Sequence, residues 1–118
     1  MSKKKKQKYN IELKSPIMIF GSPWTITFNN NLLDLGYAGL THTMENHIDV
    51  VHPKKNRKSY RTDEACLRDF KHVLKHELLH SAMHQLGLDH YCDDEVLIDL
   101  LALKWDEINS IFKEAGAL

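Results

Sequence analysis

The sequence has no surplus of charge, no long apolar run and only two cysteines. Its 16 basic and 16 acidic residues cancel, which removes any bulk electrostatic case for nucleic-acid binding. No apolar stretch approaches the ~20 residues of a membrane-spanning helix. Ile17–Phe20 is also too short for the apolar region of a signal peptide. Because Cys66 and Cys92 are too few for a disulfide framework, we expect a cytoplasmic protein with reduced thiols.

The remaining composition is that of one small domain. With 118 residues, of which 42% are hydrophobic, the chain is long enough for a single core. Charge is uneven along the chain, and residues 3–8 read K-K-K-K-Q-K. Such runs usually stay solvated, so we expect a disordered tail at residues 1–8 and a single domain at residues 9–118. A contact between this tail and nucleic acid or an anionic surface is the lesser alternative.

The apolar patterns predict strands first and helices second. Alternating residues rich in β-branched and aromatic side chains predict strands at 9–13, 24–28 and 46–51. Residues 36–43 are expected to form a bend that leads into another strand, and residues 54–61 a polar, basic loop. This order indicates an α+β domain with a short, mostly antiparallel sheet followed by two helices.

Two long helices are expected in the second half of the chain. Thr62 is a plausible N-cap for a helix from about Asp63 to Leu86, and Gly87 is close to the expected stop. Asp93 is expected to cap the last helix, which should run to about Glu114. The apolar residues of that helix predict a broad buried stripe. They are Val96, Leu97, Leu100, Leu101, Leu103, Trp105, Ile108 and Phe112.

The first of these helices contains the string H-E-L-L-H at residues 76–80, an instance of H-E-x-x-H. Positions i and i+4 share one face of a helix, so His76 and His80 could bind one metal ion from the same side. Glu77 would then lie beside a metal-bound water and could accept its proton. The other interpretation is a solvated face rich in histidine, since His72 and His84 continue the four-residue spacing. Only the 76/80 pair has a glutamate in the required position, which favours a metal site.

A catalytic metal ion of this kind needs a third protein ligand and keeps a fourth position for water. Glu95, near the start of the last helix, is preferred because a second element packed across the first can reach the ion. Asp99 lies four residues later on the same face and could accept the N–H of a ligand histidine. Asp99, His90 and Cys92 stay open as ligands, and Glu95 could instead only complement the helix dipole. His84 is disfavoured because a straight helix turns it away from the pair.

These motifs resemble those of the zincin metallopeptidases, most closely the gluzincin branch. That branch carries H-E-x-x-H on one helix and Glu-x-x-x-Asp on a following helix, here residues 76–80 and 95–99. The order of strands before the motif helix is also similar to small SprT-like and phage-encoded zincin domains. The resemblance implies one zinc ion per chain, with His76, His80 and Glu95 as its ligands.

The resemblance also implies roles for two carboxylates and departs from the family pattern in places. It makes Glu77 the general base and Asp99 the support of the first histidine. Asp94 stands where many gluzincins have Asn or Gly, and Ile98 stands where a small residue is common. The SprT-like branch uses a third histidine, which keeps His90 open as a ligand. No hydrogen-bond donor to the transition state is favoured. The candidates are Tyr60, His84, His90 and Tyr91.

We therefore expect a zinc metallopeptidase that hydrolyses a peptide or protein substrate. The substrate backbone could add as a strand to a sheet edge, for which residues 46–51 are favoured. The alternative is a catalytically silent, zincin-like zinc-binding module that binds a protein or nucleic-acid partner. Contact with nucleic acid would use the tail and the basic residues 54–58.

Overall fold

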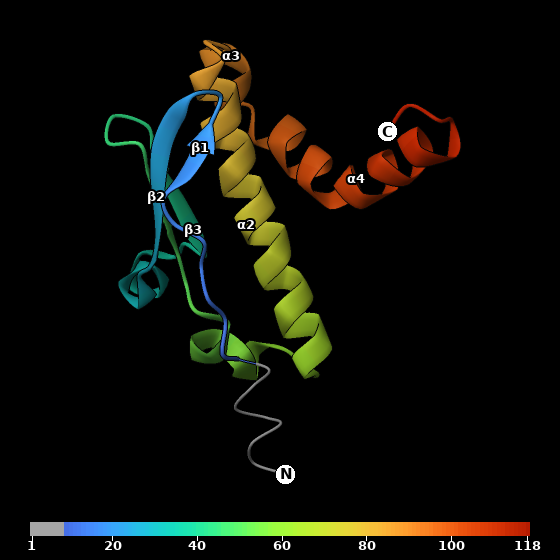
Figure 1. Cartoon of the computed structure of the whole chain (residues 1–118). Helices are drawn as coiled ribbons and strands as arrows, with labels where there is room; N and C mark the ends of the chain where they lie inside the picture. The colour runs from blue at the N-terminus through green and yellow to red at the C-terminus, as the bar shows by residue number, and fades with distance from the viewer. Residues whose placement is uncertain (1–8) are drawn as a thin grey trace.

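A four-stranded sheet lies against one side of a long helix in this α+β fold (Figure 1). The computed structural model describes residues 9–118, so the tail expected at residues 1–8 lies outside the described part. The strands are β1 (Ile17–Ile19), β2 (Ser22–Phe28), β3 (Gly39–His42) and β4 (His47–Val50). The α-helices are α2 (Asp63–Gln85), α3 (Asp89–Cys92) and α4 (Glu95–Glu114). Two 3-10 segments, η1 (Asn30–Leu35) and η2 (Pro53–Ser59), connect them.

The strands lie in the order β1-β2-β4-β3, so β3 forms one edge of the sheet. The β1/β2 and β3/β4 pairs are antiparallel and the β2/β4 pair is parallel, which agrees with the expected mostly antiparallel sheet. The prediction that residues 46–51 form the free edge is wrong. The chain reverses after β3, and β4 then inserts between β2 and β3, so both sides of β4 are hydrogen-bonded.

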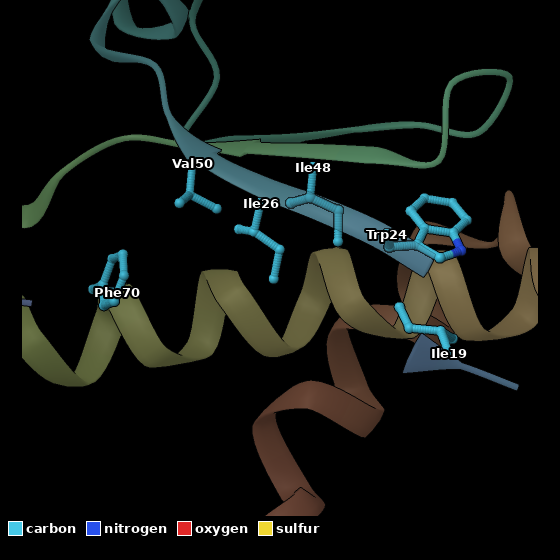
Figure 2. Packing of buried hydrophobic residues seen from close by; sticks show 6 residues of the cluster. All are labelled: Ile19, Trp24, Ile26, Ile48, Val50 and Phe70. Atoms are coloured by element: carbon cyan, nitrogen blue, oxygen red, sulfur yellow. The ribbon is translucent and has the colours of Figure 1, made fainter. Parts of the chain in front are cut away.

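The core lies between the sheet and α2 (Figure 2). Trp24 and Ile26 from β2 and Ile48 and Val50 from β4 point toward α2, as the two-residue period of a strand requires. Phe70 of α2 meets them from the other side. This packing fixes the rotation of α2 about its axis. The face of α2 that carries His76 and His80 therefore lies to the side of the sheet and is not covered by it.

The ends of α2 follow the sequence signals. The hydroxyl of Thr62 accepts a hydrogen bond from the backbone N–H of Ala65 at 3.1 Å, and Asp63 begins the helix. After the helix ends at Gln85, Gly87 adopts a φ of +75°, the left-handed conformation that glycine tolerates best. Within residues 9–118, none of the helices has the length and apolarity needed to cross a lipid bilayer.

Two segments differ from expectation. Residues 9–13 are not a strand: Ile11 and Leu13 pack against the core without joining the sheet. Alternating apolar residues show only that one face of an extended segment is buried. An extended segment that packs on the core outside a sheet has the same pattern. Residues 54–61, expected as a loop, are largely the 3-10 segment η2.

The last helix starts later and is less buried than predicted. Asp94, not Asp93, is its N-cap, and its side chain accepts from the N–H of Leu97 at 3.0 Å. The predicted broad buried stripe is wrong, because only Ile98 and Ala102 of α4 are buried. Figure 1 shows the reason: α4 starts beside α2 and then diverges from it, so its later turns face solvent.

Candidate metal centre

Three electron-pair donors from two helices meet at one point. Nε2 of His76 and Nε2 of His80, on consecutive turns of α2, are 3.1 Å apart. Glu95, the first residue of α4, places Oε2 2.9 Å from His76 Nε2 and Oε1 3.0 Å from His80 Nε2. The three side chains form a group that could hold a metal ion. The fold thus brings together the three residues that the sequence predicted as ligands.

The tautomer of His80 follows from its other nitrogen. Nδ1 lies 2.5 Å from the backbone carbonyl oxygen of Cys92. A carbonyl only accepts hydrogen bonds, so Nδ1 carries a proton, and in the neutral ring Nε2 then directs a lone pair toward His76 and Glu95. Both His80 and Cys92 are buried, which keeps this contact away from water.

Cys92 supports the site through its backbone. Its sulfur is 3.9 Å from Nδ1 of His80, the nitrogen that faces away from the other donors, and the thiol donates to the carbonyl oxygen of His80 at 3.2 Å. Burial raises the pKa of the thiol, which opposes formation of the thiolate that a metal would bind. The position and the raised pKa of its thiol therefore disfavour Cys92 as a metal ligand.

Asp99 orients His76, the first histidine of the motif. Its Oδ1 is 3.3 Å from Nδ1 of His76, so the carboxylate accepts that N–H, and in the neutral ring Nε2 of His76 is left as a lone-pair donor. Asp99 also accepts from Nε2 of His72 at 2.8 Å, and this hydrogen bond is the main reason that its pKa lies below the usual value. His72, His76 and Asp99 form a second group with metal-binding side chains. Because His76 belongs to both groups, we interpret His72 and Asp99 as residues that hold His76 in place for the first group.

Glu77 lies in the wall of the same site. Its side chain is buried, and Oε1 accepts a hydrogen bond from the hydroxyl of Thr41 on β3 at 2.8 Å. Burial raises the pKa of the Glu77 carboxyl, while the Thr41 hydroxyl and the two nearby histidines act in the opposite direction. The raised pKa increases the proton affinity of this carboxylate, which suits a general base.

Gly39 allows the edge strand to approach α2 closely. A Cβ atom at this position would lie 2.8 Å from Cγ of Glu77 and 2.9 Å from Cγ1 of Val73. Both distances are well inside normal carbon–carbon contact. The absence of a side chain at residue 39 therefore lets β3 lie directly against Glu77.

A cavity of about 500 Å³ opens between β3, α2 and the start of α4. It is lined by the predicted ligands and by Glu77, and also by Tyr37 and His72, which the sequence did not indicate. Tyr37 was missed because it lies in an irregular segment between η1 and β3, where no periodic pattern marks a side chain that faces a site.

The other candidates lie elsewhere. His90 is exposed and its ring packs against Tyr91, while Nδ1 of His84 pairs with Asp89 at 2.8 Å. Tyr60 donates to Asp69. Among the described residues that line the cavity, none is one of the four proposed transition-state donors. Within residues 9–118, His90 also belongs to neither of the two groups that could hold a metal ion.

No protein-family model matches this chain, and neither does any curated protein or solved structure. The resemblance to zincins therefore stays a prediction based on residues 76–80 and 95–99.

Proposed function

We propose that this protein is a zinc-dependent metallopeptidase. The observation that carries the proposal is the meeting of Nε2 of His76 and Nε2 of His80 with the carboxylate of Glu95 beside the buried Glu77. In their neutral forms the two imidazoles each offer a lone pair beside the carboxylate, and a cation between the three groups would be stabilised by all of them. The zincin resemblance supports the same set of residues.

The donor set fits zinc better than the other common cations. Two imidazole nitrogens and one carboxylate are a known ligand set of catalytic zinc, which keeps a fourth position for water. Ligand atoms about 2.0–2.1 Å from a tetrahedral ion lie roughly 3.4 Å apart, close to the 2.9–3.1 Å separations here. Calcium and magnesium prefer oxygen ligands alone. Bound at this place, zinc supplies Lewis acidity, which lowers the pKa of a water and polarises a peptide carbonyl.

Glu77 is the proposed general base. Its Oε1 is held by the Thr41 hydroxyl, so Oε2 is the oxygen left to accept a proton from water and later to donate it to the leaving amine. Asp99 and the carbonyl of Cys92 hold the two imidazole rings in the tautomers described above.

The substrate is proposed to bind as an added strand along β3. Among the described residues 9–118, this strand pairs with β4 on one side only, and Gly39, Leu40 and Thr41 line the cavity. An extended peptide that pairs with the free side of β3 would pass Glu77 and the three ligands. This edge replaces the one predicted from the sequence.

The first experiment is elemental analysis of zinc in protein purified without a histidine tag, followed by a cleavage assay with unstructured casein. We expect about one zinc per chain and cleavage that stops when the ion is chelated. Glu77→Gln should keep the zinc and lower the cleavage rate by about 10²–10⁴-fold. His80→Ala should lose the zinc, whereas the matched control His84→Ala, one turn further along α2, should keep both zinc and activity.

Two outcomes contradict the proposal in different ways. A chain that takes up no zinc, even after incubation with the metal, has no such site. A chain that holds one zinc and cleaves nothing is better described as the silent binding module.

A further inference from the structure

A row of exposed aliphatic side chains begins directly beside the metal centre. Val96, Leu100 and Leu103 of α4 are 80%, 54% and 62% exposed. Their i, i+4, i+7 spacing places them along one face of the helix. Together with His76, Glu95 and Asp99 they line a groove of about 580 Å³, here called the α4 groove.

The α4 groove is continuous with the metal cavity. His76, Glu95 and Asp99 line both hollows, so a molecule that fills the groove also lies against the proposed ligands. The carboxylates of Glu95 and Asp99 already lie against histidine nitrogens, at 2.9 Å from His76 and 2.8 Å from His72. The rest of the groove surface is aliphatic, and it offers no hydrogen bond to a charged side chain that loses its water there.

The length of the row favours a short peptide segment. Glu107 takes the next position of the row, four residues after Leu103, and its pairing with Lys104 at 3.3 Å interrupts the apolar row. Val96 to Leu103 spans about 10 Å of helix, which corresponds to about three residues of extended chain. A stable dimer buries about 800 Å² and 20–30 residues per partner, far more than three side chains provide.

We propose that the α4 groove binds a bulky aliphatic or aromatic side chain of the substrate, close to the bond that is cleaved. This inference rests on the proposed peptidase function and adds the substrate class. The peptide backbone occupies the metal cavity, and the neighbouring apolar side chain covers Leu100 and Leu103. Peptides with Leu or Phe at that position bind and react better than peptides with Ala, Asp or Lys.

The test separates binding from cleavage by using zinc-loaded Glu77→Gln protein. Blocked octapeptides of Ala, Gly and Ser, with Leu, Phe, Ala, Asp or Lys at each position in turn, are titrated by calorimetry. We expect Leu and Phe at one position to bind roughly tenfold or more tightly than Ala. Leu100→Ser and Leu103→Ser should remove this preference, while Ile111→Ser, an equally exposed apolar residue of α4 outside the groove, should keep it. Because both leucines are exposed, zinc content and melting temperature should stay unchanged in these variants.

Three results of the peptide titration overturn the groove proposal. They are equal binding of the Leu and Ala peptides, no binding of any peptide, and a preference that survives both leucine substitutions. A dimer that is seen by sedimentation and abolished by Leu100→Ser would make a second copy the occupant of the groove and would also overturn the proposal.

Cleavage by the wild type is scored separately. Cleavage without apolar preference would contradict the groove proposal and support the peptidase proposal. Leucine-dependent binding without cleavage would support binding in the groove and contradict the peptidase proposal. If the chain takes up no zinc, the same titration of the metal-free protein tests whether the groove binds an apolar side chain.

Discussion

The hydroxyl of Thr41 lies 2.8 Å from Oε1 of Glu77 and ties the edge strand β3 to the proposed general base on α2. The same hydroxyl is 3.1 Å from the backbone oxygen of Glu77, so it can donate to either acceptor. Gly39, two residues earlier on the same strand, lets β3 lie against the Glu77 side chain. The orientation of Glu77 therefore depends on the sheet as well as on the helix that carries it.

Removing the Thr41 hydroxyl should affect catalysis more than metal binding. Thr41→Val keeps the shape of the side chain but leaves Oε1 of Glu77 without its donor, so we expect kcat to fall about tenfold at unchanged zinc content. Thr41→Ser keeps the hydroxyl and should retain most of the rate. Steady-state kinetics with zinc quantified in each sample measure the effect. Equal rates for the valine and serine variants would show that this contact has no role in catalysis.

Adding one methyl group at Gly39 should separate β3 from α2. The new Cβ would overlap Cγ of Glu77 and Cγ1 of Val73, so Gly39→Ala should lower the free energy of unfolding by about 1–3 kcal/mol and reduce activity. Urea denaturation measures the first effect. Val73→Ala in the same chain frees part of the space and should recover some stability relative to the sum of the two single changes. Strict additivity would mean that the strand moves away without contacting Val73.

The loss of zinc affinity on substitution should differ among the acidic residues around the site, according to the role proposed for each. Asp99→Ala removes the support of His76 and should weaken zinc binding about 10–100-fold. Glu95→Gln changes a proposed direct ligand and should weaken zinc binding further. Asp93→Asn changes an acid that lines the same cavity but belongs to neither metal-binding group, so affinity should be unchanged. Competition with a chromogenic chelator gives the three constants. A loss in Asp93→Asn equal to that in Glu95→Gln would indicate that general acidity, not ligation, holds the ion.

Acid should destabilise the fold through Asp49, on the sheet face away from α2. Burial alone raises the pKa of this carboxyl, but hydrogen bonds from Thr27, His47, His42 and Asn29 outweigh it and hold the pKa at about 2. A depressed folded-state pKa stabilises the fold above the unfolded value of about 3.9, and this stability is lost as the pH falls toward 2. The shift corresponds to roughly 2 kcal/mol.

The check is urea denaturation of wild type and Asp49→Asn at pH 6, 4 and 3. The stability difference between them should be largest at pH 6 and should shrink as the pH falls below about 4. Asp34→Asn, which changes an exposed acid of η1, serves as the control and should follow the wild type throughout. A difference that does not change with pH would mean that the Asp49 charge is not what stabilises the network.

The sequence by itself determined the features that depend on local spacing. A helix places residues four apart on one face, so the pairing of His76 with His80 and of Glu95 with Asp99 followed from the sequence. The Thr62 cap and the glycine after α2 are also local signals, and the structure confirms both. The α+β class followed for the same reason, because each element has its own hydrophobic period.

Only the tertiary structure decided what depends on contacts between distant segments. It placed Glu95, and not His90, beside the histidine pair, and it put β3 rather than residues 46–51 at the sheet edge. It brought Thr41 to Glu77 across 36 positions of the chain. It also left much of the apolar surface of α4 exposed, where sequence periodicity predicted burial. Periodicity shows which face of an element is apolar, but only the packing of the whole chain decides which element, if any, covers that face.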